Sequence, residues 1–262
     1  MGIVIAVASG KGGTGKTSVT GGVAVMNQKG GTGKTSFTAN VGLALAALGK
    51  NTLCLDCDIG LRNLDISLGL SDRALMDFAD VALGRCTLSR AAVHHPDLKE
   101  LSLLTAPMAL PPSLSPYRVR SMLSAARTLY DYVLIDAPAG LGPGFQYAVC
   151  GADRALVVAT NDASSLRDAQ RVVAELDWLP QVHLVMNRIQ PKLLRKLRTT
   201  IDDAMNTAGL PLIGVIPEDA QVMLCANRGI PLTSQGRKGA AMACRNIAWR
   251  LMGRRIPIMR IR

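Results

Sequence analysis

Short runs of apolar, often β-branched residues alternate along the chain with longer stretches in which Ala and Leu are mixed with charged residues. The runs predict strands at residues 3–8, 52–55, 101–105, 132–135, 155–160, 182–186 and 212–216. The longer stretches predict helices near residues 35–48, 73–83, 116–129, 164–176, 192–208 and 239–252. This alternation predicts an α/β fold with a mostly parallel twisted sheet and helices on both faces. Ligands of such sheets bind beyond the carboxyl ends of the strands.

One octapeptide, Lys-Gly-Gly-Thr-Gly-Lys-Thr-Ser, occurs twice, at residues 11–18 and 29–36. Its glycines let the backbone wrap a phosphate with the N–H groups pointing inward, its second lysine adds a charge, and its threonine supplies a hydroxyl for magnesium. A helix beginning there adds the positive end of its dipole. The chain is therefore expected to bind a nucleotide.

The two copies differ in the residues on their C-terminal side. Gly21 and Gly22 come soon after the first loop, and adjacent glycines disfavour a helix. The second loop has a shorter strand before it, at 23–26, but the helix after it is rich in Ala and Leu and stops at Gly49, a favourable C-terminal cap. We therefore assign phosphate binding to the second copy, that is, to Gly30, Gly31, Thr32, Gly33, Lys34, Thr35 and Ser36.

The repeat also suggests a division of the chain. Residues 1–22 are interpreted as a duplicated strand and phosphate-loop segment forming a non-functional extension. Residues 23–253 are interpreted as one nucleotide-binding domain, and residues 254–262 as a basic and apolar C-terminal tail. The apolar start of the chain imitates a secretion signal, but no basic residue precedes it and a phosphate loop comes directly after it, so we expect a strand and a cytoplasmic protein.

Composition narrows the alternatives. The 262 residues are 48% hydrophobic, enough for a sizeable core, yet no stretch approaches the ~20 apolar residues of a membrane span. The six cysteines are scattered, which favours reduced thiols over disulfides. Cys54 and Cys57 have C-x-x-C spacing, but residues three apart on a strand point to opposite faces, so a redox or zinc role is not expected. His94, His95 and His183 lack partners at ligand spacing.

Positive charge is concentrated near the C-terminus. The formal net charge is +11, and residues 237–262 contain eight basic residues and no acidic one. A second basic cluster lies on a predicted helix and consists of Lys192, Arg195, Lys196 and Arg198. Such clusters favour binding to an anionic partner, either membrane lipid or nucleic acid. The alternative is that they only form a solvated surface.

Acidic residues come at the ends of two of the predicted strands. Asp136 directly follows the apolar run at 132–135, and in phosphoryl-transfer sites a carboxylate at the end of such a strand orders the ligands of the magnesium ion. Gly140, four residues later, permits close approach of the backbone to a terminal phosphate. Asp56 and Asp58 end the strand at 52–55 and project to one side of an extended chain. Asp56 is expected to reach the magnesium waters and Asp58 to orient the attacking water, with helix capping as the alternative for Asp58.

Together these motifs resemble those of the MinD/ParA family of deviant Walker A ATPases over residues 23–253. The resemblance rests on Lys29-Gly-Gly-Thr-Gly-Lys34-Thr35, on Asp136-Ala-Pro-Ala-Gly140 and on residues 56–65, 160–168 and 216–219. Ile59-Gly60 comes after the second aspartate where ParA-type proteins usually carry Pro-Gln, so the MinD branch is favoured. The duplicated loop is not a feature of the family.

The resemblance implies a P-loop NTPase fold, ATP and Mg²⁺ as cofactors, hydrolysis of ATP to ADP and phosphate, and an ATP-dependent homodimer. Lys29 would reach the partner's phosphates, Lys34 would hold the β and γ phosphates, and Thr35, Asp56 and Asp136 would serve the metal. On the adenine side the resemblance places Asn187, Arg188 and Pro217.

The function implied is a switch that positions the cell-division septum through a MinC-like partner or a membrane surface. Membrane contact would come from residues 254–262, although Pro257 works against the amphipathic helix usual in that position. Two alternatives stay open. One is a ParA-like ATPase that partitions DNA or cargo through the basic cluster at 192–198, and the other is a scaffold that binds ATP without hydrolysing it.

Overall fold

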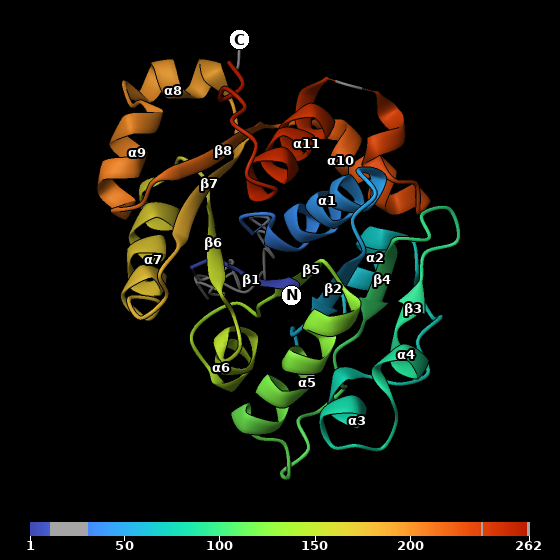
Figure 1. Ribbon diagram of the computed structural model, residues 1–262. Helices are drawn as coiled ribbons and strands as arrows, with labels where there is room; N and C mark the ends of the chain where they lie inside the picture. Colours follow the sequence, from blue (N-terminus) through green and yellow to red (C-terminus); the bar gives the residue numbers. More distant parts are fainter. Residues whose placement is uncertain (11–30, 237, 261–262) are drawn as a thin grey trace, which may run out of the picture.

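The computed structural model describes residues 1–10, 31–236 and 238–260. Within these ranges eight strands form one sheet in the order β3-β4-β2-β5-β1-β6-β7-β8 (Figure 1). Neighbouring strands are parallel except at the β3 edge, where β3 runs antiparallel to β4. The strands are β1 (Ile3–Ala8), β2 (Thr52–Asp56), β3 (Val93–His94), β4 (Leu101–Leu104), β5 (Tyr132–Asp136), β6 (Arg154–Ala159), β7 (Val182–Ile189) and β8 (Leu212–Pro217). The predicted α/β class with a mostly parallel sheet is confirmed.

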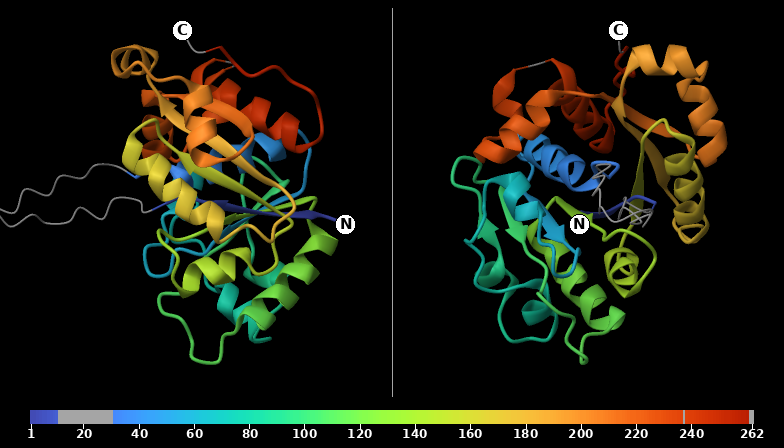
Figure 2. Two further views of the ribbon diagram at one scale, coloured as in Figure 1. Left: turned by 90° about the vertical axis from the view of Figure 1, so that its left-hand side faces the viewer. Right: turned by 180° about the vertical axis from the view of Figure 1, so that it is seen from behind.

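Helices cover both faces of this sheet, as the views in Figure 2 show. One face carries α1 (Lys34–Ala47), α2 (Leu64–Leu68), α10 (Ala220–Arg228), the 3-10 turn η1 (Leu232–Gln235) and α11 (Gly239–Leu251). The other carries α3 (Phe78–Ala82), α4 (Leu88–Ala91), α5 (Pro116–Leu129), α6 (Pro143–Val149), α7 (Ala163–Ala174) and α9 (Ile201–Ala208). The short helix α8 (Pro191–Leu197) has no buried residue and lies near the C-terminal end of the chain (Figure 1).

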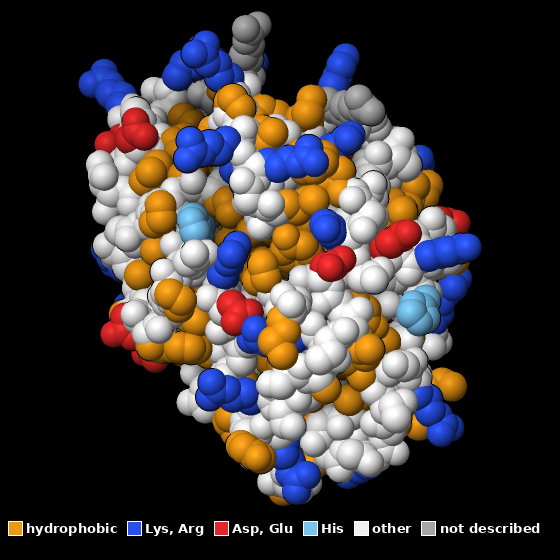
Figure 3. Space-filling view, viewed as in Figure 1, with side chains coloured by type: hydrophobic (Ala, Val, Ile, Leu, Met, Phe, Trp, Pro, Cys, Tyr) orange, Lys and Arg blue, Asp and Glu red, His pale blue; other side chains and the backbone are white. Residues whose placement is uncertain are grey.

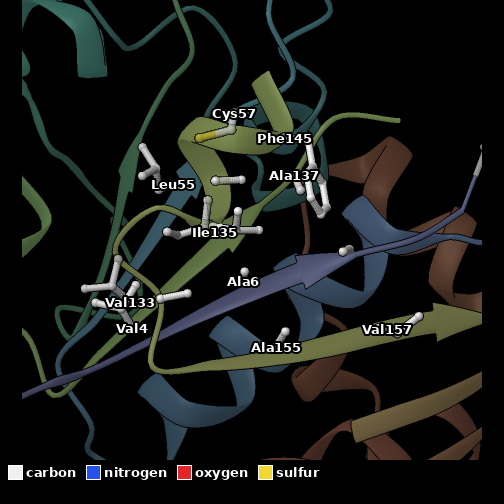
Figure 4. Packing of buried hydrophobic residues seen from close by; sticks show 14 of the residues in the cluster. Val4, Ala6, Leu55, Cys57, Val133, Ile135, Ala137, Phe145, Ala155 and Val157 are labelled. Atoms are coloured by element: carbon white, nitrogen blue, oxygen red, sulfur yellow. The ribbon is translucent and has the colours of Figure 1, made fainter. Parts of the chain in front are cut away.

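Strand β1 lies in the middle of the sheet and contributes to the cores on both sides. Val4 and Ala6 belong to the core beneath α5 and α6, whereas Ile5 and Val7 belong to the core beneath α1 and α11. Figure 4 shows Val4 and Ala6 packed beside residues of β5 and β6. These side chains are fully buried because successive side chains of a strand point to opposite faces and both faces are covered.

The central position of β1 corrects part of the interpretation of residues 1–22. Ile3–Ala8 comes from the first copy of the repeat, yet it pairs with β5 on one side and β6 on the other and is not an extension outside the fold. Helix α1, by contrast, begins at Lys34 in the second copy. The loop at 11–18 and the strand expected at 23–26 lie outside the described residues.

Two predicted helices also differ from the structure. The helix expected at 192–208 is divided into α8 and α9, because Arg198 has left-handed backbone dihedrals (φ 52°) and Thr200 forms a capping box with Asp203 that starts α9. The helix expected at 73–83 is reduced to α3, whose capping box begins at Asp77. Gly49 does stand just beyond the end of α1 with φ 76°, as expected.

Cys54 and Cys57 point into different cores, so the expected divergence of their sulfurs is confirmed. Burial raises the pKa of both thiols, which makes them poor nucleophiles at neutral pH. In the described residues no group of three or more His, Cys, Asp or Glu side chains could hold a metal ion by itself. A helix of the length and apolarity that a membrane span requires is likewise missing from that part of the chain.

Candidate functional site

The predicted metal ligands meet where β2 and β5 end. These strands are neighbours, and Asp56 lies directly opposite Asp136 in their register. Asp136 is completely buried, and three side chains from α1 lie within hydrogen-bonding distance of its carboxylate. Lys34 Nζ donates to Oδ1 at 2.7 Å, and Thr35 Oγ1 donates to Oδ2 at 2.6 Å. The phosphate-loop lysine and threonine of the second copy therefore converge on one strand-end carboxylate.

Thr38 is a member of this cluster that the sequence reasoning did not assign to the site. Its Oγ1 lies 3.2 Å from Asp136 Oδ1 and 3.0 Å from the Lys34 carbonyl, so its single hydroxyl hydrogen serves one acceptor at a time. A signal was present in the sequence, because Thr38 is one helical turn beyond Lys34 and is matched by Thr20 in the first copy.

Asp56 is nearly as buried as Asp136, and burial together with the nearby Asp136 charge raises its pKa to about 7. Its carboxylate accepts hydrogen bonds from the backbone N–H groups of Asp58 (2.8 Å) and Leu64 (3.2 Å). Two carboxylates held this close in a buried place, with a threonine hydroxyl beside them, fit a hard divalent cation such as Mg²⁺, which prefers oxygen ligands and would relieve their repulsion.

Asp58 lies at the rim of this cluster and is half-buried. Burial raises its pKa, and the Lys34 charge opposes that shift. Asp58 does not cap α2, because the first N–H of that helix bonds to Asp56. Among the described residues no side chain donates a hydrogen bond to its carboxylate, so the expected water-positioning role stays a prediction.

The end of the phosphate loop has the geometry of an anion site. Gly33 precedes α1 in a left-handed conformation (φ 77°), and no side chain of the described residues caps the helix, so its first N–H groups can face a ligand. Gly140, after β5, is also left-handed (φ 87°), with open space where a Cβ would stand. Lys29 and Gly30 lie outside the described residues, and so does the whole first loop.

The residues expected on the adenine side approach the same loop from β7 and β8. Asn187 donates from Nδ2 to the Thr32 carbonyl at 2.8 Å, and Arg188 donates from Nη1 to the Gly31 carbonyl at 3.3 Å. Arg188 also pairs with Glu218, the residue directly after Pro217 at the end of β8. A cavity of about 870 Å³ opens beside these groups, and Gly10, Gly31, Thr32, Thr160, Arg188 and Glu218 are among its lining residues. Its volume suits a nucleotide-sized ligand.

Comparison with known proteins agrees with this geometry. The family model for the CobQ/CobB/MinD/ParA nucleotide binding domain matches residues 23–232, beginning in the second copy of the repeat. The chain is 37% identical to the septum site-determining protein MinD of Bacillus subtilis, with 98% of this chain and 92% of that protein covered. It is also 37% identical to the Helicobacter pylori protein of that name, with the same coverage.

Solved structures give the same result. The MinC:MinD cell division protein complex of Aquifex aeolicus contains a chain that superposes with a TM-score of 0.85 at 35% identity, with 98% of each chain covered. The septum site-determining protein MinD of Pyrococcus horikoshii, solved with Mg-ADP, superposes with a TM-score of 0.77 at 27% identity, with 96% of each chain covered.

Proposed function

This chain belongs to the MinD/ParA family of P-loop ATPases, and we propose that it works as a MinD-type switch in septum positioning. ATP binding joins two copies of the chain, the ATP-bound pair engages a MinC-like protein, and hydrolysis releases it. The observation that supports this proposal is the convergence of Lys34 and Thr35 on Asp136 at the end of β5, as a phosphate and magnesium site would require.

Each side chain has a role in this proposal. Lys34, now bonded to Asp136, is at hand to pair with the β and γ phosphates of the substrate, and Gly31–Ser36 presents backbone N–H groups to them. Thr35, Asp56 and Asp136 would hold Mg²⁺, which neutralises phosphate charge when it is bound. Asp58 orients the attacking water, and Gly140 lets the backbone approach the terminal phosphate. Asn187, Arg188 and Pro217 flank the adenine.

The choice of loop is tested by ATP binding and turnover of paired variants. Lys34→Ala is expected to abolish ATP binding because it removes the charge at the phosphates, whereas Lys16→Ala, the matched change in the first copy, should leave turnover nearly intact. The opposite pattern would assign the site to the first loop. Failure of the wild type to turn over ATP while binding it would favour a scaffold instead of a switch.

Dimerisation is tested in the same paired way. Lys29 is proposed to reach the phosphates of the other copy, and Lys11 is its counterpart in the first copy. Light scattering on the wild type should give a dimer with ATP and a monomer with ADP. Lys29→Ala should lose the ATP-dependent dimer and Lys11→Ala should retain it, and loss in both variants would argue against a specific role for Lys29.

The C-terminal tail is proposed as a peripheral membrane contact. Residues 254–260 are not helical, as Pro257 predicted, and they lie along the domain. Arg250 donates to the carbonyls of Ile256 (2.9 Å) and Pro257 (2.6 Å), and Arg254 stacks on the ring of Trp249. Figure 3 shows Lys and Arg side chains gathered at the end of the molecule where the tail and α8 lie in Figure 1.

A single short anchor binds membranes only marginally, so two tails in one dimer are needed for stable attachment. We expect the wild type to sediment with anionic but not neutral liposomes in ATP, and truncation after Gly253 to abolish this without changing ATP binding. Equal sedimentation in ATP and ADP would show that the tail is an ordinary solvated end.

The exposed cations of α8 favour one second candidate, an ATP-dependent DNA-partitioning protein. Lys192, Arg195, Lys196 and Arg198 are all exposed and could contact phosphates of a duplex. Such contacts release counterions, so DNA affinity should fall steeply with salt. Equal DNA-binding signals at low salt with and without ATP would remove this candidate.

A further inference from the structure

Asn187 makes a contact that an adenine ligand alone does not require. Its side chain is buried near the carboxyl end of β7, and its Nδ2 donates to the Thr32 carbonyl at 2.8 Å. A carbonyl can only accept a hydrogen bond, so the NH₂ end of the amide must face the loop. The same nitrogen lies only 2.6 Å from the position that a Cβ on Gly33 would occupy. Asn187 is thus packed against the phosphate loop.

Arg188 makes a similar contact one residue later. Its Nη1 lies 3.3 Å from the Gly31 carbonyl, and its Nε and Nη2 are held by the Glu218 carboxylate at 2.9 and 3.3 Å. Arg188 has left-handed dihedrals (φ 56°), which are uncommon for a residue with a Cβ. Asn187 and Arg188, which are consecutive in β7, therefore bond to the carbonyls of Thr32 and Gly31, which are consecutive in the loop.

Holding these carbonyls fixes the direction of the neighbouring N–H groups. In a trans peptide the C=O and the N–H of the next residue point in opposite directions. When the Thr32 carbonyl is drawn toward Asn187, the N–H of Gly33 is turned to the other side of the loop. The Gly31 carbonyl and the N–H of Thr32 behave in the same way. A phosphate loop needs its N–H groups turned toward the phosphates, and this arrangement provides it before a nucleotide arrives.

We infer that Asn187 is a positioning residue for the phosphate loop, with Arg188 and Glu218 supporting it, in addition to any contact that it makes with the base. Its Oδ1, at the other end of the amide, is the acceptor that we assign to an amino group of the base. One side chain would then join recognition of the base to the shape of the phosphate site. This inference rests on the proposed assignment of residues 31–36 as the working loop.

A ligand without a base separates the two roles. Inorganic tripolyphosphate with Mg²⁺ carries the phosphates of ATP but nothing for a base contact, and its inhibition constant can be measured against ATP turnover. Asn187→Ala should weaken tripolyphosphate inhibition roughly 5- to 10-fold, the effect of one lost hydrogen bond. The variant should raise KM for ATP. It should also lower kcat, because the N–H groups of the phosphate loop would point away from the phosphates in the transition state. Pro217→Ala, on the base side only, should weaken ATP binding and spare tripolyphosphate.

A second variant guards against simple misfolding. Asn187→Asp keeps the size of the side chain but replaces the donor with an acceptor that repels the Thr32 carbonyl, so tripolyphosphate inhibition should weaken at least as much as in Asn187→Ala. Circular dichroism checks that both variants are folded. If kcat and the tripolyphosphate inhibition constant are unchanged while KM for ATP rises, Asn187 is a base contact only and the inference is wrong. If the wild type binds neither ligand, the proposed function itself fails.

Discussion

Two deletions in the repeated segment give opposite expectations, and together they test how the chain divides. Deleting residues 11–28 removes one copy of the repeat and joins Gly10 to Lys29, so that β1 leads into the second loop. Deleting residues 2–22 instead removes β1 and leaves 23–26 as the only apolar run before the loop. The first deletion keeps every residue of the described fold, and the second removes the central strand of the sheet.

The structure sets the size of both effects. Val4, Ile5 and Val7 are completely buried, and side chains of this kind contribute ~1.5–3 kcal/mol each, or about 5–9 kcal/mol together. That loss is comparable to the ~5–15 kcal/mol by which most domains are stable. The shorter deletion removes 18 residues from the connection between Ala8 and Lys34, which lowers the entropy cost of closing it by about 1 kcal/mol. After this deletion, Lys29 and Gly30 connect Gly10 to Gly31, and both of these glycines line the same cavity.

Thermal unfolding and calorimetric titration with Mg-ATP measure both outcomes. The protein lacking 11–28 should melt at or slightly above the temperature of the wild type and should bind ATP at least as well. The protein lacking 2–22 should be unfolded or aggregated. A folded, ATP-binding protein lacking 2–22 would refute this reasoning, because residues 23–26 would then be able to take the place of β1 and the first 22 residues would be a dispensable extension after all.

Three further variants test the site and the tail. Thr38→Val removes a hydroxyl beside Asp136 and should weaken Mg-ATP binding about 5-fold, the effect of ~1 kcal/mol. Thr20→Val, the matched change in the first copy, should leave binding unchanged. Equal effects of the two variants in calorimetry would contradict the assignment of the site to the second copy. Folding raises the pKa of Asp56 to about 7, so the folded protein holds this proton more tightly than the unfolded chain does. The resulting contribution to stability is complete below the unfolded pKa and is lost as the pH rises through 7. Asp56→Asn should therefore raise the melting temperature of the nucleotide-free protein more at pH 8 than at pH 5, and an equal rise at both would exclude this linkage. Arg250→Gln removes the hydrogen bonds that hold the tail and should speed tryptic cleavage within residues 254–260, whereas an unchanged rate would show that other contacts hold it.

Local patterns predicted most of the elements because each depends on residues close together in sequence. The helix at 116–129 was predicted to the residue, since a proline after Ser115 and an amphipathic run mark it locally. The break between α8 and α9 was missed because Arg198 adopts a conformation that the sequence does not announce. The order of the strands was also beyond reach. The repeat led Ile3–Ala8 to be assigned outside the domain, and only its pairing with β5 and β6 shows that it is a central strand.

The candidate site shows the same limit in another form. The phosphate loop is recognisable because its chemistry is contained in eight consecutive residues, and Asp56 and Asp136 are recognisable because each ends a strand. What the sequence could not supply is the contact between Asn187 and Thr32, which joins residues 155 positions apart. It depends on β7 reaching the open side of the loop, and β7 is two places from β1 in the sheet. The residues proposed to carry charge to the phosphates are thus found by motif, whereas the proposed positioning role of Asn187 follows only from the fold.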